Sequence, residues 1–323
     1  MTLTPTTAKA LRISAFVVKM LLGLVFALSA VTKLLAIDKF ELYVYSYGFL
    51  SLNASFIVAR LCIAVELLLA IGLLSNLHGR FVTLCTMLAL VAFSCFLGYA
   101  LLTGRSDSCH CFGDLLPFNP QQSLLKNAVL VLLTVVAMYV PSWRWRPHWA
   151  LWIPVIVAPL ATVFIVSSPD NWLFHTEKEP YNKASFARAI AADAPLAAQP
   201  ADPARRLVAF YSPRCPYCRL AAQKLTGIQQ RNDLPAQAFV TVFPLTDTAA
   251  YSAFYRDIPA QHFAQVNLQP DTFLHITYGL FPLILLLDGD SVVYTYSYRS
   301  INEHEIASFF LSDTPSALTA DTI

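Results

Sequence analysis

Charged residues are scarce in this chain. Only 13% of its 323 residues are Asp, Glu, Lys or Arg, whereas 56% are hydrophobic. So low a charge content excludes an ordinary soluble globular protein. The formal net charge is only +2, so the chain also lacks the basic excess of a nucleic-acid-binding protein, and we expect no nucleic-acid partner.

The apolar residues concentrate before residue 167, and the charges become denser after it. Five apolar stretches approach the roughly 20 residues that a helix needs to cross a bilayer. In chain order they are Ile13–Leu35, Phe56–Leu74, Phe81–Leu102, Leu124–Val140 and Trp149–Val166. The fourth is short, and Pro154 and Pro159 are expected to kink the fifth. The sequence therefore predicts a multi-pass membrane part followed by a water-soluble part.

The first stretch has no small-x-small cleavage site and keeps Lys19 and Lys33, so we interpret it as a retained span. Orientation follows from the basic residues of short loops, which lie mostly on the cytoplasmic side. The residues that favour a cytoplasmic N-terminus are Lys9, Arg12, Arg80, Arg144 and Arg146. Five crossings then predict a bacterial inner-membrane protein with its soluble part in the periplasm or outside. Two crossings separate residues 103–119 from the soluble part, so we expect both on one side of the membrane.

A Cys-x-x-Cys motif lies near the start of the soluble part, in LVAFYSPRCPYCRLAAQKL (Leu207–Leu225). A short β-prone run ends at Ser212, and an amphipathic helical pattern begins at Cys215. Unpaired N–H groups and the helix dipole favour a thiolate at such a helix start. We predict that Cys215 is the attacking thiol and that Cys218, one turn on, closes a disulfide with it. A zinc half-site is the alternative.

This segment resembles the thioredoxin superfamily, and CPYC is the glutaredoxin-like version of its active site. The pattern that follows has the same order. It predicts a strand at Phe239–Phe243, a helix at Asp247–Ile258, a weak strand at Phe263–Val266, two strands around the Asp-Gly turn of YGLFPLILLLDGDSVVYTY, and a closing helix at residues 301–311. The pattern looks closest to the TlpA-like membrane-anchored branch. The predicted soluble fold is therefore an α/β thioredoxin-like domain.

The same resemblance implies site residues and reveals one departure. Pro282 would be the cis-proline that faces the cysteine pair, with Phe281 before it. Pro216 and Tyr217 would complete the substrate-binding residues. Thioredoxins usually carry a buried acid in the strand before the motif, where this chain has Ala209. We therefore expect the proton of the resolving cysteine to use another group or water.

A second cysteine pair, Cys109 and Cys111, lies between apolar stretches in SDSCHCFGDLLP. A disulfide between residues two apart forms a tight ring, and strained disulfides are labile and oxidising. This favours a redox role over a structural disulfide or a soft-metal site formed by Cys-His-Cys. His110 is either a proton donor beside the thiols or a solvated loop residue.

The membrane part resembles the DoxX/MauE family of four-helix membrane proteins. The resemblance rests on GLVFALSAVTKL, VELLLAIGLL and above all CHCFG, and it covers roughly residues 11–141. It implies periplasmic disulfide chemistry, and quinol oxidation in DoxX relatives. The expected organisation is a four-helix domain (1–141), a fifth transmembrane helix (142–170), a linker with the start of the soluble domain (171–206), and a thioredoxin-like domain (207–323).

Glu66 is an acidic residue deep in a predicted span, where an ionisable group is costly and is normally paired or functional. Cys62 lies four residues earlier and so on the same helix face. Lys33 and Arg60 are the candidate partners of Glu66. We interpret the group as a proton path or a quinone-headgroup contact, with a structural ion pair as the alternative. The cysteines inside predicted spans (Cys62, Cys85 and Cys95) are mainly expected to act as small hydrophobic residues.

These patterns together predict a membrane-bound thiol–disulfide oxidoreductase. Two electrons would pass from an extracytoplasmic client protein with cysteines to the CPYC pair, then to the CHC pair, then to a membrane carrier, most simply quinone. No covalently bound cofactor is expected, and the surrounding lipid and quinone are the membrane partners. The reverse flow, which would reduce periplasmic disulfides, stays open. So do a copper- or zinc-handling membrane protein and a non-catalytic assembly factor.

Overall fold

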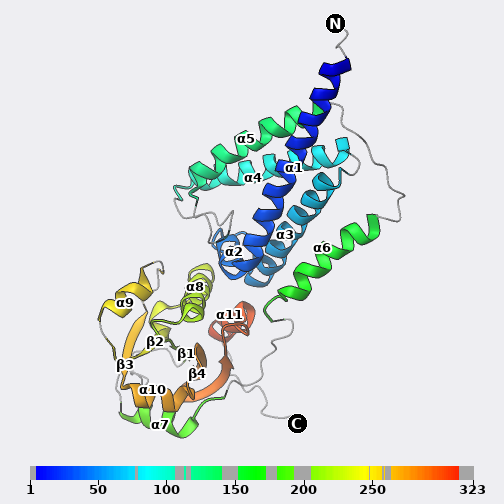
Figure 1. The fold of residues 1–323 in the computed structure, drawn as a ribbon. Coiled ribbons are helices and arrows are strands. Elements are labelled where there is room, and N and C mark those ends of the chain that lie inside the picture. Colours follow the sequence, from blue (N-terminus) through cyan, green and yellow to red (C-terminus); the bar gives the residue numbers. More distant parts are fainter. Residues whose placement is uncertain are drawn as a thin grey trace. The chain divides into compact units, whose positions relative to one another are not determined.

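The protein is described by a computed structural model (Figure 1). The described residues are 5–76, 79–105, 113, 118–139, 152–171, 180–192, 205–246, 248–256, 258 and 263–312. The chain divides into two compact units, one formed by Met1–Val44 and Ser55–Ser168, the other by Tyr45–Ala54 and Pro169–Ile323. The main boundary therefore falls two residues before the predicted one at 170. That Tyr45–Ala54 belongs to the second unit was not predicted.

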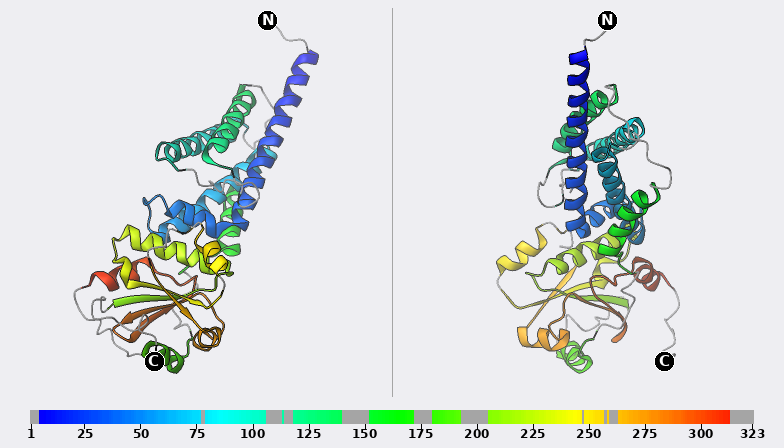
Figure 2. Two further views of the ribbon diagram at one scale, coloured as in Figure 1. Left: turned by 90° about the vertical axis from the view of Figure 1, so that its left-hand side faces the viewer. Right: turned by 45° about the vertical axis from the view of Figure 1, so that its right-hand side comes forward.

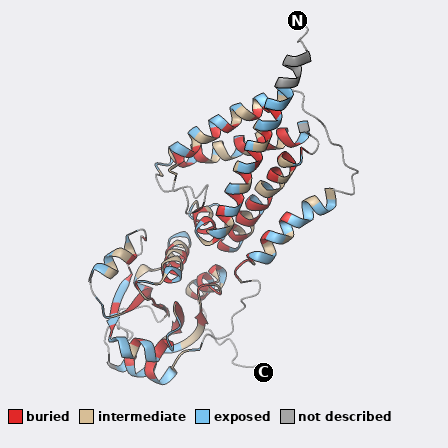
Figure 3. Ribbon diagram, viewed as in Figure 1, coloured by how far each residue is buried: buried red, intermediate tan, exposed pale blue. Residues whose placement is uncertain are grey.

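The first unit consists of helices. They are α1 (Pro5–Leu35), α2 (Ile37–Tyr45), α3 (Leu52–Leu74), α4 (Gly79–Leu102), α5 (Pro120–Tyr139) and α6 (Trp152–Val166). In the part of the chain that the structure describes, four of these (α1, α3, α4 and α5) have the length and composition that a membrane crossing needs. Each of these helices buries one stripe of side chains and exposes the rest (Figure 3). On α1, for example, Leu22 and Phe26 are buried, while Leu21, Leu24 and Leu28 are exposed. The predicted four-helix membrane domain is confirmed.

Helix α6 is shorter than the predicted fifth span. It has 15 residues, a length of about 22 Å, against the ~30 Å of a bilayer's hydrocarbon core. Its surface is apolar and largely exposed, as at Ile153, Val157 and Ile165 (Figure 3). A helix that is apolar all round belongs in a core or a membrane. The predicted start at Trp149 lies outside the described residues, so a fifth crossing stays a prediction.

The second unit is built on a mixed sheet. Its strands are β1 (Arg205–Phe210), β2 (Phe239–Pro244), β3 (Ala264–Leu268), β4 (Leu283–Asp288) and β5 (Ser291–Tyr296). Among the described residues they are ordered β3-β2-β1-β4-β5, with β1, β2 and β3 parallel and β4 and β5 antiparallel to their neighbours. Helices cover both faces of this sheet (Figure 2). They are α7 (Lys183–Ala192), α8 (Pro216–Arg231), α9 (Thr248–Tyr255), α10 (Pro270–Thr277) and α11 (Glu303–Leu311).

Strand alternation assigns the side chains of β1 to the two faces. Val208 and Phe210 join a core cluster with Phe186 of α7 and Phe273 of α10. The alternate residues, including Ala209, point to the opposite face. This strand order, with a Cys-x-x-Cys helix directly after β1, is the thioredoxin-like arrangement that the sequence predicts.

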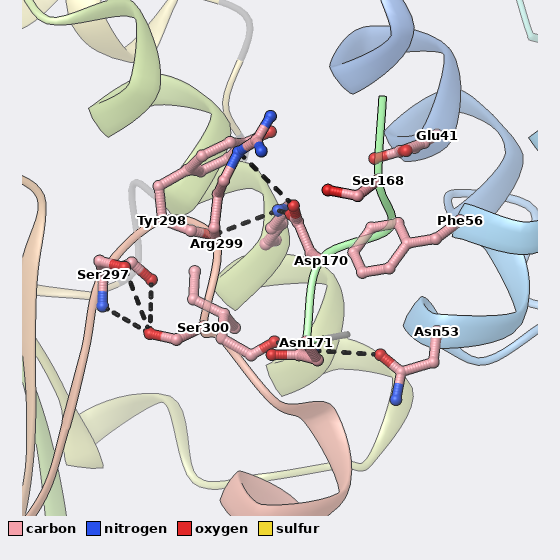
Figure 4. A network of polar contacts seen from close by, with 12 residues as sticks. Glu41, Asn53, Phe56, Ser168, Asp170, Asn171, Ser297, Tyr298, Arg299 and Ser300 are labelled. Carbon is pink, nitrogen blue, oxygen red and sulfur yellow. Dashed lines mark hydrogen bonds and ion pairs between the residues drawn. The ribbon is translucent and has the colours of Figure 1, made fainter. Parts of the chain in front are cut away.

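The described residues around the start of the predicted linker and soluble domain (171–206) make contacts within the second unit. Asp170 accepts a hydrogen bond from the buried Lys224 of α8 at 2.6 Å. The amide of Asn171 donates to the Ile301 carbonyl at 2.9 Å (Figure 4). Helix α7, from within the predicted linker, places Phe186 in the core. Helix α7 has few apolar positions other than alanine, so its sequence alone does not show that it packs in the core.

The segment Tyr45–Ala54 is held in the second unit by a buried carboxylate. Glu303, at the start of α11, accepts hydrogen bonds from the Leu52 N–H at 2.6 Å and from the Tyr45 hydroxyl at 3.1 Å. Gly227 of α8 leaves room for Tyr45, because a Cβ at residue 227 would lie 2.6 Å from the tyrosine ring. A short stretch between α2 and α3 is thus an integral part of the thioredoxin-like unit.

Candidate functional site

The Cys-x-x-Cys pair is formed by the chain reversal between β1 and α8. Cys215 is the N-cap of α8, in an extended conformation (φ −83°, ψ 119°), and its sulfur accepts the Cys218 N–H at 3.3 Å. Pro216 occupies the first helical position, where its fixed φ suits the helix and its missing N–H costs nothing. The sequence SPRCPYC thus places a sulfur atom at the end of a helix where unpaired N–H groups converge.

The two cysteines differ in exposure. Cys215 is half-buried, whereas Cys218 is fully buried, and both are free thiols. Burial is the main cause that raises the pKa of the Cys218 thiol above its ordinary value, and its hydrogen bond with Cys215 adds to the shift. A reagent or client can therefore reach Cys215 but not Cys218. This geometry agrees with the predicted roles of attacking and resolving thiol.

The loop before β4 lies against Cys215. The Phe281–Pro282 peptide bond is cis, which confirms the conformation implied by the thioredoxin resemblance. The Cys215 sulfur lies 4.0 Å from the Phe281 carbonyl oxygen, a long sulfur contact. Pro282 is buried and Phe281 half-buried against the core of α7 and α10. The structure therefore brings the predicted proline and the reactive sulfur together.

Exposed apolar side chains occur in the first turn of α8 and in the segment before the cis bond. Tyr217 of α8, two positions after Cys215, is exposed, and its ring lies 5.4 Å from that of Tyr298. Tyr278 and Leu280 precede the cis bond and are also exposed. Tyr278 and Leu280 were not predicted as site residues, although a Tyr-Gly-Leu run next to a predicted cis-proline could have indicated them.

The CHC motif (Cys109, His110 and Cys111) lies outside the described residues, but the glycine that ends CHCFG is described. Gly113 has φ +54°, and a Cβ there would lie 2.2 Å from the Thr32 carbonyl oxygen of α1. Any larger residue at position 113 would clash with the backbone. Gly113, two residues after Cys111, thus lies against the backbone of Thr32 in α1. Thr32 is the residue before Lys33 in the sequence.

Glu66 pairs with Lys33, one of its two predicted partners. The Lys33 Nζ donates to Glu66 Oε1 at 2.5 Å and to the Ser29 hydroxyl at 2.7 Å, which links α3 to α1. Lys126 of α5 lies within electrostatic reach of both charges. The second oxygen of Glu66 is buried and has no hydrogen-bond partner among the described residues. The pair therefore keeps an unused acceptor inside the membrane part.

Arg60 is not a partner of Glu66, contrary to the prediction. It pairs with Glu41 of α2 and also donates to the carbonyls of Ser167 at 2.6 Å and Phe56 at 2.8 Å. Glu66 follows Arg60 by six positions, so the two side chains point about 120° apart around α3. The charged residues within the predicted spans could not indicate the Arg60–Glu41 pair, because Glu41 lies outside those spans.

The remaining cysteines of the membrane part do not form a pair in the structure. Cys62 and Cys95 are exposed on the helix surface and Cys85 is half-buried. Cys62 shares α3 with Glu66 and interacts electrostatically with it. Within the described ranges, no group of three or more His, Cys, Asp or Glu is arranged to hold a metal ion.

Parts of this chain are similar to known proteins. Residues 11–140 match the model of the family described as methylamine utilisation protein MauE. A curated relative, Protein TlpB of Flavobacterium psychrophilum, is 25% identical over 268 residues, which cover 67% of this chain and 73% of the relative. A solved structure of a secreted Mycobacterium tuberculosis disulfide oxidoreductase, homologous to E. coli DsbE, matches at 18% identity and a TM-score of 0.26. The match covers 32% of this chain and 78% of that one.

Proposed function

We propose that this protein, whose N-terminal part is similar to the MauE family, is a membrane-bound thiol–disulfide oxidoreductase. The observation that carries the proposal is the pairing of a half-buried N-cap thiol, Cys215, with a fully buried thiol, Cys218, beside the cis-Pro282 loop. Such an arrangement exposes one sulfur to a partner and shields the other until the first has reacted. The similarity to Protein TlpB, which extends over 268 residues, supports the proposed oxidoreductase function.

The chemistry is exchange through a mixed disulfide. In the oxidising direction, a client thiolate attacks the Cys215 sulfur of the Cys215–Cys218 disulfide, and Cys218 leaves and takes up a proton. A second client thiolate then attacks the client's own sulfur and releases Cys215, so the client gains a disulfide and the domain holds two thiols. The exposed Tyr217, Tyr278 and Leu280 would bind an extracytoplasmic client whose cysteine segment is extended or only partly folded.

The reduced domain would next be reoxidised by the CHC pair. Cys215 attacks the strained Cys109–Cys111 disulfide, and Cys218 resolves the mixed species. Fusion in one chain raises the effective concentration of the two pairs. This route needs both pairs on one side of the membrane, hence a crossing by α6 in addition to the four long helices. The apolar exposed surface of α6 supports such a crossing.

The electrons would leave through a membrane carrier, most simply quinone. Oxidation of the two CHC thiols gives a disulfide, two protons and two electrons, and quinone takes up both to form quinol. Lys33 directly follows Thr32, the residue that Gly113 contacts, and the second oxygen of Glu66, which has no hydrogen-bond partner among the described residues, suits a proton path or a contact to the quinone headgroup. The cell compartment that fits this scheme is the bacterial inner membrane, with the thioredoxin-like domain outside the cytoplasm.

The experiment uses the full-length protein in liposomes that contain ubiquinone, with a reduced two-cysteine peptide as electron donor. We expect quinol to form in step with peptide disulfide. The variant Cys109→Ser/Cys111→Ser should stop quinol formation while peptide exchange at Cys215 persists. Quinol formation at the normal rate in that variant would exclude the CHC pair from the route.

The opposite direction is tested by the reduction potentials of the two pairs, each measured with the other pair replaced by serine. The proposed direction requires a higher potential for CHC than for CPYC. The reverse order would support a reductant conduit instead. Metal analysis of the purified protein tests the copper or zinc alternative, which requires stoichiometric metal bound with loss of titratable thiols.

A further inference from the structure

A buried lysine lies in the middle of α8. Lys224 is 1% exposed, although lysine is almost never fully buried unless it is paired. Its Nζ donates to Asp170 Oδ2 at 2.6 Å and to the Tyr298 carbonyl at 3.2 Å, and it lies 3.8 Å from the centre of the Tyr298 ring. Because well-packed apolar residues are often at least as stabilising as a buried ion pair, stability alone does not account for Lys224.

Tyr298 lies in a short turn between β5 and α11. The Ser297 N–H donates to the Ser300 hydroxyl at 2.8 Å, and the Ser300 N–H donates to the Ser297 carbonyl at 3.3 Å (Figure 4). These two bonds close the turn on either side of Tyr298. The turn is therefore fixed within itself, and Lys224 fixes it to α8.

The ring of Tyr298 also contacts the redox motif. Its centroid lies 5.4 Å from that of Tyr217, with the two planes inclined at 47°, which is within the favourable range for an aromatic pair. Lys224 follows Tyr217 by seven positions, almost two full turns, so both side chains project from one face of α8. Tyr298 thus contacts a buried charge and a member of Cys-x-x-Cys on the same helix face.

Tyr217 is supported by this contact without being covered. It is 52% exposed, whereas Tyr298 is 5% exposed. A neighbouring ring restricts the rotamers of Tyr217, so a client that packs on it loses less side-chain entropy on binding. Tyr217 lies two positions after Cys215, the sulfur that a client thiolate attacks. A supported, exposed ring at this position suits an apolar side chain next to the client's cysteine.

We propose that Tyr298, fixed by Lys224, is a positioning residue that holds Tyr217 ready to bind the apolar side chain beside a client's cysteine. The proposal rests on the proposed function and names the preferred clients, those with an apolar residue next to the cysteine. Tyr298 is buried and acts only through Tyr217. Without the ring of Tyr298, Tyr217 turns among several rotamers, and each binding event must order it again.

The test measures a single disulfide transfer from the full-length protein. The variant Cys109→Ser/Cys111→Ser, with Cys215 and Cys218 oxidised to a disulfide, is mixed with an excess of a reduced two-cysteine peptide in the absence of quinone. Two peptides are compared, which differ only in having leucine or serine beside the first cysteine. The rate of peptide disulfide formation against peptide concentration gives a maximal rate and a half-saturating concentration for each.

We expect the protein with Tyr298 to reach half-saturation at a lower concentration of the leucine peptide than of the serine peptide. Tyr298→Leu should raise the half-saturating concentration of the leucine peptide about fivefold, the size of the effect of ordering one side chain on binding. The maximal rate and the response to the serine peptide should stay the same. Tyr298→Phe keeps the ring and should retain the preference for leucine.

The matched control is Tyr294→Leu on β5, whose ring stacks on that of Tyr296 at 6.1 Å. It removes an aromatic ring four positions before Tyr298, and the kinetics with both peptides should stay unchanged. If Tyr298→Leu does not fold, Lys224→Met/Asp170→Met decides by the same criterion. This double variant removes both charges of the buried pair together and releases the turn that carries Tyr298.

Three results would overturn the role of Tyr298. They are an unchanged half-saturating concentration in Tyr298→Leu, an equal fall of the maximal rate with both peptides, and the lack of any preference for the leucine peptide in the protein that keeps Tyr298. A protein with Tyr298 that forms no peptide disulfide at all would instead overturn the proposed function.

Discussion

The two units place polar groups in apolar surroundings by different means. In the membrane part, charged side chains neutralise one another: Lys33 pairs with Glu66, and Arg60 pairs with Glu41 and also donates to backbone carbonyls. In the thioredoxin-like unit, a helix end and a loop carbonyl surround the Cys215 sulfur. The lesson is that helical spans need partner charges, whereas an α/β domain can build a reactive site from its own backbone.

The largest effect should come from breaking the backbone-built site at its buried thiol. Cys218→Ser leaves the helix end intact but removes the resolving sulfur, so turnover should stop and mixed disulfides through Cys215 should accumulate. Mass spectrometry of alkylated protein measures them. Trapping by Cys215→Ser in place of Cys218→Ser would reverse the assigned roles.

Removing one member of the most buried charge pair should come next. Arg60→Met removes the cation that is paired with the buried Glu41 carboxylate, a change that costs about 3–5 kcal/mol in such pairs. The double variant Arg60→Met/Glu41→Met should cost much less, because both charges are gone. Denaturant unfolding in micelles gives the free energy of each variant. Equal losses in the single and double variants would contradict the pairing argument.

A smaller effect is expected at the ion pair assigned to the carrier. Glu66→Gln keeps the shape of the side chain but removes its charge, and it should slow quinone-linked turnover about tenfold, less than the ~10²–10⁴-fold contribution of a group that transfers the proton directly. Membrane insertion and peptide exchange at Cys215 should persist. Normal quinol formation in this variant would leave Glu66 only a structural role.

The smallest effect is expected where water already solvates a charge. Asp290 is 67% exposed and lies 3.3 Å from the buried Arg206 guanidinium. Asp290→Asn should change the free energy of unfolding by less than about 1 kcal/mol, because solvent screens the pair. Thermal unfolding at two salt concentrations measures it. A loss as large as that of Arg60→Met would remove the distinction between the solvated and apolar settings.

The sequence by itself determined the elements whose signals are local. Runs of apolar residues identified the four long helices, and strand–turn–helix chemistry around CPYC placed Cys215 at the start of α8. Proline at position 282 marked the cis bond, though only through resemblance to thioredoxins. These features need no knowledge of distant residues, since hydrophobic length, turn chemistry and helix capping act within a few positions.

Only the tertiary structure decided which distant groups meet. It paired Arg60 with Glu41 rather than Glu66, drew Tyr45–Ala54 into the thioredoxin-like unit through Glu303, and packed Phe186 of α7 into the core of that unit. It also set Thr241 beside Ala209. Each of these depends on helix rotation or strand register. A single residue step in either turns a side chain to another face, and the local sequence does not record which partner that face will meet.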